Sequence, residues 1–161
     1  MTDLRTERLV LHPVDADEAA RIVQGCPGPD DAWAPDFPFE GDVVGATMFL
    51  RATAAHGEQQ PFGHYVVVRG TDGRAIGGIG FKGAPRAGTA EIGYGLAPSA
   101  RGSGHAAEAV RALADLARRH GVTRLVADTE RSNLASRRTL AHAGFRETGT
   151  SGDLVDHVLE L

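Results

Sequence analysis

Arg101-Gly102-Ser103-Gly104-His105-Ala106 carries the strongest structural signal in the sequence. It follows an apolar run, residues 91–97, and it opens an alanine-rich segment with helical periodicity over residues 106–120. A loop of small residues that leads directly into a helix leaves several backbone N–H groups at the positive end of the helix dipole, and this arrangement binds phosphate groups. No lysine follows the last glycine and a third glycine is missing, so the stretch fits neither the phosphate loop of nucleoside triphosphatases nor the dinucleotide-binding fingerprint. It therefore predicts a phosphate-binding loop of another class.

The composition is that of one globular domain spanning residues 1–161, with 42% hydrophobic and 24% charged residues. A net charge of −4 argues against a nucleic-acid partner held by bulk electrostatics. The single cysteine, Cys26, excludes an internal disulfide, and the seven histidines show no H-x-x-x-H spacing, so we expect no metal site. No apolar run reaches membrane-spanning length and the N-terminus lacks a signal-peptide core, so we expect a cytoplasmic protein without a membrane partner.

The apolar periodicity and the turn residues predict the order of the elements. The turn at residues 71–73 joins two strands into a hairpin, and residues 89–130 form a strand–helix–strand crossover. We expect strands over residues 4–13, 62–69, 74–82, 89–96, 124–130 and 153–160, helices over residues 15–24, 43–55, 106–120 and 133–143, and an irregular segment over residues 25–45. This order predicts an α+β fold in which a mixed, mostly antiparallel central sheet is flanked by helices.

Three ordered motifs resemble those of one known family. They are LRTERLVL at residues 4–11, PSARGSGHAAEA at residues 98–109, and Asn133-Leu134-Ala135-Ser136 followed by Ala143-Gly144-Phe145. Together they resemble the GNAT superfamily of N-acetyltransferases, and within it the RimJ/RimL-type branch. The resemblance covers nearly the whole chain, and it implies a single GNAT-type domain in which a splayed pair of strands forms an acetyl-CoA cleft.

The resemblance also implies where acetyl-CoA, the cosubstrate, binds. The strand before the loop diverges from its neighbour, so its backbone amides can pair with the pantetheine arm as an added strand would. The loop then holds the pyrophosphate, and Asn133 reaches the pantetheine arm. Without the resemblance, Asn133 fits the N-cap of a helix equally well. Arg101 is then alternatively a solvated surface charge. The cofactor-binding residues implied are Tyr94, Gly95, Leu96, Arg101, Gly102, Ser103, Gly104, His105, Ala106 and Asn133.

Acetyl transfer from a thioester to an amine requires a group that removes a proton from the ammonium and a proton donor for the leaving thiolate. The candidate bases are Glu91, at the start of the strand before the loop, and Asp128, on the neighbouring crossover strand. Either is alternatively an ordinary surface carboxylate. Many members of the superfamily carry a tyrosine seven residues after the asparagine, where this chain has Leu140. The resemblance to the RimJ/RimL branch makes Ser136 the candidate acid, although from the residues alone it is equally an ordinary helix serine.

The irregular segment carries three aromatic residues, Trp33, Phe37 and Phe39, which the resemblance places over the acceptor groove. The acceptor is then a primary amine, either a small molecule or a peptide N-terminus, and the branch favours the N-terminus. The branch often forms homodimers. Two alternatives stay open: a non-catalytic acyl-CoA-binding sensor or partner module, and a different α/β protein that binds a small nucleotide. The missing tyrosine supports the first alternative, and the missing loop lysine argues against the second.

Overall fold

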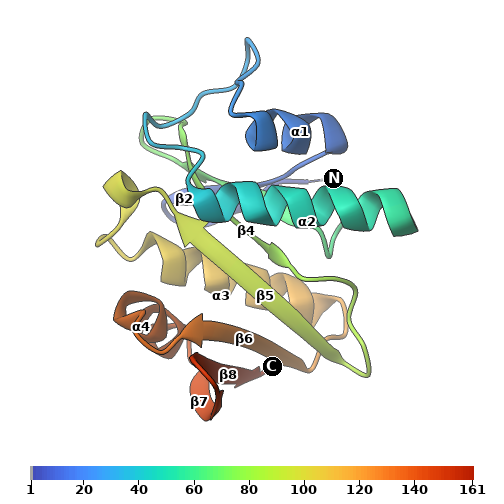
Figure 1. Ribbon diagram of the computed structural model, residues 1–161, viewed down its shortest axis with the longest axis vertical. Helices are drawn as coiled ribbons and strands as arrows, with labels where there is room; N and C mark the ends of the chain where they lie inside the picture. The colour runs from blue at the N-terminus through green and yellow to red at the C-terminus, as the bar shows by residue number, and fades with distance from the viewer. Residues whose placement is uncertain (1) are drawn as a thin grey trace.

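The computed structural model describes residues 2–161, which form one eight-stranded sheet with helices on both faces (Figure 1). The strand order is β1-β2-β3-β4-β5-β6-β8-β7. The strands are β1 (Leu4–Arg5), β2 (Leu9–Pro13), β3 (His64–Arg69), β4 (Ala75–Phe81), β5 (Thr89–Leu96), β6 (Arg124–Glu130), β7 (Arg146–Ser151) and β8 (Leu154–Glu160). The helices are α1 (Ala16–Gln24), α2 (Glu40–His56), α3 (His105–Arg119), α4 (Leu134–His142) and the short 3₁₀ helix η1 (Pro98–Ala100). The predicted α+β class is confirmed.

Helices α2 and α3 cover opposite faces of the central strands (Figure 1). The apolar stripe of α3 buries Val110, Leu113 and Ala117. Strand β4 is buried over most of its length, and Ile76 and Ile79 are fully enclosed between the layers. A strand covered on both faces has little freedom to move, so β4 and its partner β5 form a rigid support for a site.

Strands β5 and β6 are the only parallel pair among the strands of residues 2–161, and they separate along their length. Their pairing covers only Thr89–Glu91 against Arg124–Val126. Beyond that point β5 stays paired with β4 as far as Leu96, whereas β6 stays paired with β8 as far as Glu130. The two strands therefore diverge from a closed end toward the loop before α3 and toward α4 (Figure 1). The predicted splayed pair is confirmed.

The prediction missed one strand, β7, which pairs with β8 as an antiparallel hairpin at the edge of the sheet. All six residues of β7, RETGTS, are exposed, so the sequence has no alternation of buried and exposed positions there. Backbone pairing with β8 forms this strand, and the hydrophobic pattern carries no sign of it. The predicted final strand over residues 153–160 is confirmed as β8.

Many predicted boundaries shift by one or two residues, and two elements differ by more. Helix α2 begins at Glu40 instead of residue 43, because the Asp42 carboxylate accepts a hydrogen bond from the backbone N–H of Phe39 (2.8 Å) and closes the first turn. A phenylalanine at the N-cap gives no helix-start signal. The predicted strand over residues 4–13 is two strands, β1 and β2, separated by a turn that the Thr6 side chain holds through the backbone N–H of Leu9 (3.0 Å).

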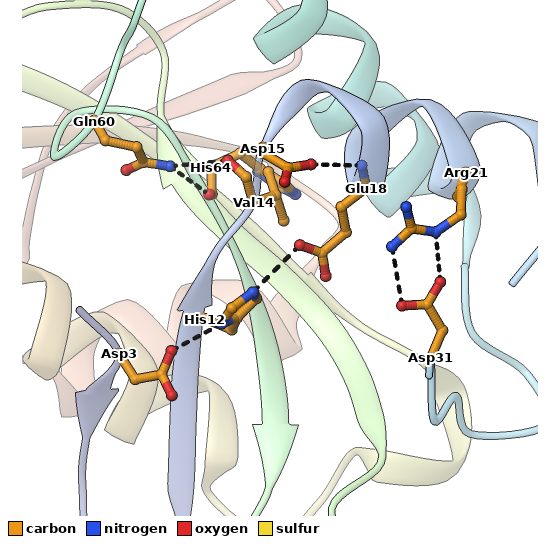
Figure 2. A network of polar contacts seen from close by, with 9 residues as sticks. All are labelled: Asp3, His12, Val14, Asp15, Glu18, Arg21, Asp31, Gln60 and His64. Atoms are coloured by element: carbon orange, nitrogen blue, oxygen red, sulfur yellow. Dashed lines mark hydrogen bonds and ion pairs between the residues drawn. The ribbon is translucent and has the colours of Figure 1, made fainter. Parts of the chain in front are cut away.

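Polar contacts hold the N-terminal elements together (Figure 2). The His12 ring on β2 contacts the carboxylates of Asp3 (2.8 Å) and Glu18 (3.4 Å), and these contacts raise the pKa of His12 to about 9. The Arg21 guanidinium on α1 donates to both carboxylate oxygens of Asp31 (2.6 and 3.1 Å). This bidentate pair fixes the start of the irregular segment 25–39 to α1.

Candidate active site

A groove of about 1600 Å³ runs over the splayed strands. Helix α2 forms one wall, and strand β6 with the first turn of α4 forms the other. Seven of the predicted site residues line it: Phe39, Glu91, Tyr94, Gly95, Asp128, Asn133 and Ser136. The structure thus brings together residues that lie up to about a hundred positions apart in the sequence, at the place where β5 and β6 separate.

Glycines form the floor of this groove. Gly78 of β4 stands opposite Gly95 of β5, and Gly80 stands opposite Gly93. A Cβ atom added at Gly95 would meet no other atom within 4 Å, so open space lies directly above this residue. The absent side chains leave the backbone of β5 accessible to a ligand.

The predicted phosphate loop lies beyond this groove, at the N-terminus of α3. Gly102 and Gly104 have φ of +87° and +80°, a backbone conformation that favours glycine. Within residues 2–161 the backbone N–H groups of Gly102, Ser103 and Gly104 donate no hydrogen bond. Unused donors at the positive end of a 15-residue helix are the arrangement that binds an anion, so the loop fits a pyrophosphate.

Arg8 and Glu108, for which the sequence predicted no role, hold this loop in place. The Arg8 guanidinium donates to the backbone carbonyl of Ser103 (2.7 Å) and to the Glu108 carboxylate (2.7 Å). The same carboxylate accepts from the Thr6 hydroxyl (2.6 Å) and from the Arg8 backbone N–H (2.8 Å). Two of the motifs that carry the family resemblance, residues 4–11 and 98–109, are therefore in contact. The occurrence of both motifs in one chain was the sign of this contact in the sequence.

The Arg101 side chain turns back toward the end of β5. Its Nε donates to the carbonyl of Leu96 (3.0 Å), and its guanidinium carbon lies 4.8 Å from the centre of the Phe39 ring. Close by, the Asp36 carboxylate accepts from the backbone N–H (2.8 Å) and hydroxyl (2.6 Å) of Ser99, and these bonds hold its pKa below the usual range. Arg101 and Asp36 thus connect the loop region to the irregular segment.

The two candidate bases share one partner. The Lys82 ammonium lies 3.0 Å from the Glu91 carboxylate and 3.6 Å from the Asp128 carboxylate. Glu91 stands in the last paired position of β5 with β6, and Asp128 lies two residues further along β6. All three side chains line the groove at the closed end of the splay. Lys82 was not singled out in the sequence.

The first turn of α4 closes the other side. The Asn133 side chain accepts from the backbone N–H of Ser136 (3.1 Å), so Asn133 is the N-cap of α4 while it also lines the groove. The Tyr94 hydroxyl donates to the carbonyl of Ser136 (3.1 Å), and burial raises the pKa of Tyr94. Tyr94 therefore joins β5 to α4 across the splay. Leu140 is fully buried in the core.

Of the three aromatic residues expected over the acceptor, only Phe39 lines the groove. Phe37 is 5% exposed and belongs to the core, and Trp33 packs edge-on against it with ring centres 5.2 Å apart. Trp33 and Phe37 thus pack within the irregular segment and do not line the groove. Their packing explains the aromatic content of this segment without a ligand.

Two general features complete the description. Among residues 2–161, no three side chains of the His, Cys, Asp and Glu types gather into a group that could hold a metal ion. In the same range, no helix is both long enough and apolar enough to cross a bilayer.

The splayed sheet, the groove above it and the glycine loop at the start of α3 together define the fold of an acetyltransferase domain. Residues 8–146 match the family described as "Acetyltransferase (GNAT) domain". The chain therefore belongs to the GNAT acetyltransferase family, whose members bind acetyl-CoA.

Individual relatives agree with this assignment. The chain is 36% identical over 86 residues to an uncharacterized N-acetyltransferase, YjdG, of Bacillus subtilis; the match spans about half of each protein, 52% of this chain and 51% of YjdG. An acetyltransferase from Agrobacterium tumefaciens has a similar structure, with a TM-score of 0.70 and 23% identity over 100% of this chain and 95% of that one. RimJ of Mycobacterium smegmatis, solved with CoA-disulfide, has a TM-score of 0.64 and 24% identity over 94% of this chain and 81% of that one. At identities of 23% and 24%, the likeness to these two structures shows the fold alone.

Proposed function

We propose that this protein is an acetyl-CoA-dependent N-acetyltransferase that transfers the acetyl group to a primary amine by direct attack on the thioester. The observation that carries the proposal is the joint geometry of the splay and the loop. Unused N–H groups of Gly102, Ser103 and Gly104 stand at the mouth of the same divergence whose floor is bare at Gly95. A long cofactor with a diphosphate at one end and a reactive group at the other fits this arrangement.

Each part of the site has a role in this proposal. Acetyl-CoA, when bound, supplies the activated acetyl group. The residues of the chain hold the two reactants together, which by itself removes a large part of the barrier. The N–H groups from Gly102 to Ala106 face the pyrophosphate, and the amides of Tyr94, Gly95 and Leu96 pair with the pantetheine arm. Asn133 reaches the arm from α4.

Glu91 and Asp128 serve proton removal from the acceptor ammonium in this proposal. Lys82 already contacts both carboxylates. In this proposal they therefore act indirectly, by binding the water molecules through which the proton leaves the groove. Ser136 is the proposed donor to the leaving thiolate, since its side chain is half-buried in the first turn of α4 and lines the groove. Phe39 contacts the acceptor.

The acceptor in this proposal is a small-molecule amine or a peptide N-terminus. Assignment to the RimJ/RimL-type branch, which favours an N-terminus, rests on the three sequence motifs and on the likeness to RimJ. A homodimer, which this branch often forms, and the cytoplasmic location expected from the sequence belong to the same proposal. The groove carries charges of both signs, with Glu91 and Asp128 on one side and Arg51 on the other, so its charge does not select between the acceptors.

Titration calorimetry with acetyl-CoA, followed by a thiol-release assay against a panel of alkylamines, polyamines and N-terminal peptides, tests the proposal. We expect binding of acetyl-CoA and release of thiol with one acceptor class. Binding without release on the whole panel supports the sensor, which the buried Leu140 and the engaged carboxylates favour. If acetyl-CoA does not bind at all, both the transferase and the sensor are excluded.

A further inference from the structure

His64 on β3 is a buried histidine to which the proposed function assigns no role. Its side chain is 7% exposed and lines the groove. Its backbone carbonyl accepts from the Gln60 amide (3.0 Å; Figure 2) and from the Val14 N–H (3.0 Å), but its ring makes no hydrogen bond to any residue of the described chain. Burial lowers the pKa of His64 to about 4, so the imidazole is neutral near pH 7.

Three glycines make room for this ring. A Cβ atom at Gly45 of α2 would lie 2.8 Å from Cε1, one at Gly78 of β4 would lie 2.9 Å from Nε2, and one at Gly80 would lie 3.0 Å from Nδ1. A side chain at any of these positions would displace the imidazole, because the interior is close-packed. The ring therefore occupies a slot that two separate elements leave open for it.

A second buried polar group, Asp42, borders the same space as the ring. Asp42 of α2 is 3% exposed, and its buried Oδ1 atom lies near the backbone N–H of Gly78 without a well-formed hydrogen bond among residues 2–161. The same point at which a Cβ of Gly78 would stand lies 2.9 Å from Nε2 of His64 and 3.1 Å from Oδ1 of Asp42. Burial raises the pKa of Asp42 to about 6. Buried polar groups in proteins normally have partners, so two poorly paired groups beside one space indicate a place where a ligand or water binds.

This pair stands next to the proposed reaction centre. Gly78 is directly opposite Gly95, and opposed Cβ positions in an antiparallel pair are about 4.5–5.5 Å apart. The elements packed on the ring contribute one charged group, Asp42 of α2, since β4 presents only glycines there. Further out, the Arg101 charge lowers the pKa of Asp42, and Cε of Lys82 lies 3.2 Å from the Cβ position of Gly93.

We propose that the His64 imidazole is the first acceptor of the proton from the acceptor ammonium, and that Asp42 is a positioning residue that holds the imidazolium. This inference rests on the proposed function and deepens it. An N–H bond of the ammonium breaks and its proton moves to the free ring nitrogen. The amine lone pair then forms the bond to the thioester carbonyl carbon, the C–S bond breaks, and the thiolate takes the proton of the Ser136 hydroxyl, which the second amine proton replaces. The proton on His64 leaves through water toward Glu91 and Asp128.

The first test needs no turnover. Histidine-specific ¹⁵N labelling, with His64 assigned by the loss of its signals in His64→Gln, gives a direct view of the ring. We expect n-butylamine hydrochloride to shift the ring-nitrogen signals of His64, and an equal concentration of n-butanol to leave them in place. Signals of His64 that stay fixed up to saturating n-butylamine would overturn the proposal, whatever the result with acetyl-CoA.

The second test is kinetic and uses the acceptor found in the thiol-release assay. We expect His64→Gln to lower kcat at least a hundredfold with the affinity for acetyl-CoA unchanged within twofold. We expect Asp42→Asn, which keeps an oxygen for the Phe39 N–H, to lower kcat about tenfold and to shift its pH profile. The matched control is His157→Gln, since His157 is equally buried but hydrogen-bonded to Thr129 (2.9 Å) and does not line the groove.

Circular dichroism of all variants separates loss of fold from loss of chemistry, and His64→Asn serves if His64→Gln does not fold. A folded His64 variant with wild-type kcat and pH profile contradicts the inference while leaving the transferase intact. Failure of acetyl-CoA to bind the wild-type protein contradicts the transferase, and the ¹⁵N titration still decides whether His64 meets the amine.

Discussion

At Gly95, an added side chain is expected to impair ligand binding without impairing folding. The φ of Gly95 lies outside the positive range and its Cβ position faces empty space, so a side chain there fits the folded chain without strain. The same atoms would occupy the floor of the groove, where the reactants meet in the proposed function. At Gly78 and Gly80, by contrast, a side chain would collide with His64, so both folding and chemistry would suffer.

We therefore expect Gly95→Val to leave the thermal midpoint within about 2 °C of the wild type, because valine suits a strand. We expect kcat/KM for the acceptor to fall at least tenfold, which is about 1.4 kcal/mol of transition-state binding. Differential scanning fluorimetry and the thiol-release assay measure the two effects. Gly149→Val on β7 is the control, because its Cβ position is also open but lies outside the groove. Equal activity of the two variants would disprove that the reactants meet above Gly95.

At the scale of elements, the phosphate loop depends on the N-terminal strands. Arg8 and Glu108 connect the turn before β2 to the loop and to the first turn of α3 through four hydrogen bonds. An anion site of backbone N–H groups works only if the groups are held in a fixed geometry. The contact between the two motifs is thus a positioning device for the loop.

Arg8→Ala is expected to raise the dissociation constant for acetyl-CoA about tenfold, because the Ser103 carbonyl loses its partner. The stability loss stays near 1 kcal/mol, since the ion pair is partly exposed. Calorimetric titration measures the first effect and chemical denaturation the second. Arg5→Ala, which removes a more exposed arginine 3.7 Å from Asp3, controls for the lost charge.

Glu108→Gln separates loop geometry from charge at the same site. It removes a negative charge near the proposed pyrophosphate site and weakens the hold on Arg8. Weaker binding of acetyl-CoA by this variant would support the geometric role. Tighter binding would mean that charge alone matters, and the account of the loop would then be wrong.

The elements differ in how far the sequence revealed them. The bounds of β5 and β6 match the prediction residue for residue, because Gly88 and Pro98 flank β5 and Gly121 precedes the alternating pattern of β6. Strand β7 was missed because its exposed polar residues have no partner within their own segment. The same limit applies to the site. Gly95 and the loop carry local signals, whereas His64, Asp42 and Lys82 acquire meaning only when α2, β3 and β5 come together.

At the scale of the molecule, the splay divides the sheet into two parts. Strands β1 to β5 pair antiparallel with one another, and β6 to β8 form a second antiparallel set. Only three residue pairs between β5 and β6 join the sets within the sheet, and Tyr94 adds a bond to α4. The part formed by β1 to β5 therefore needs its own stabilisation, and the contacts of His12 on β2 supply a pH-dependent portion of it.

His12 connects β2 to the Asp3 segment and to Glu18 of α1, and its pKa rises from 6.5 to about 9 in the folded protein. A raised pKa in the folded state means that its stabilising effect is fully present below pH 6.5 and is lost as the pH rises through 9. Because the side chain is 47% exposed, solvent screening reduces the effect to about 1 kcal/mol. We expect His12→Gln to lower the free energy of unfolding by this amount at pH 6 and by almost nothing at pH 10. Urea denaturation at both pH values measures the difference, with His142→Gln, an exposed histidine on α4, as the control. A cost that is the same at both pH values would show that His12 acts through its shape, and the N-terminal ion pairs would then contribute no pH dependence to the fold.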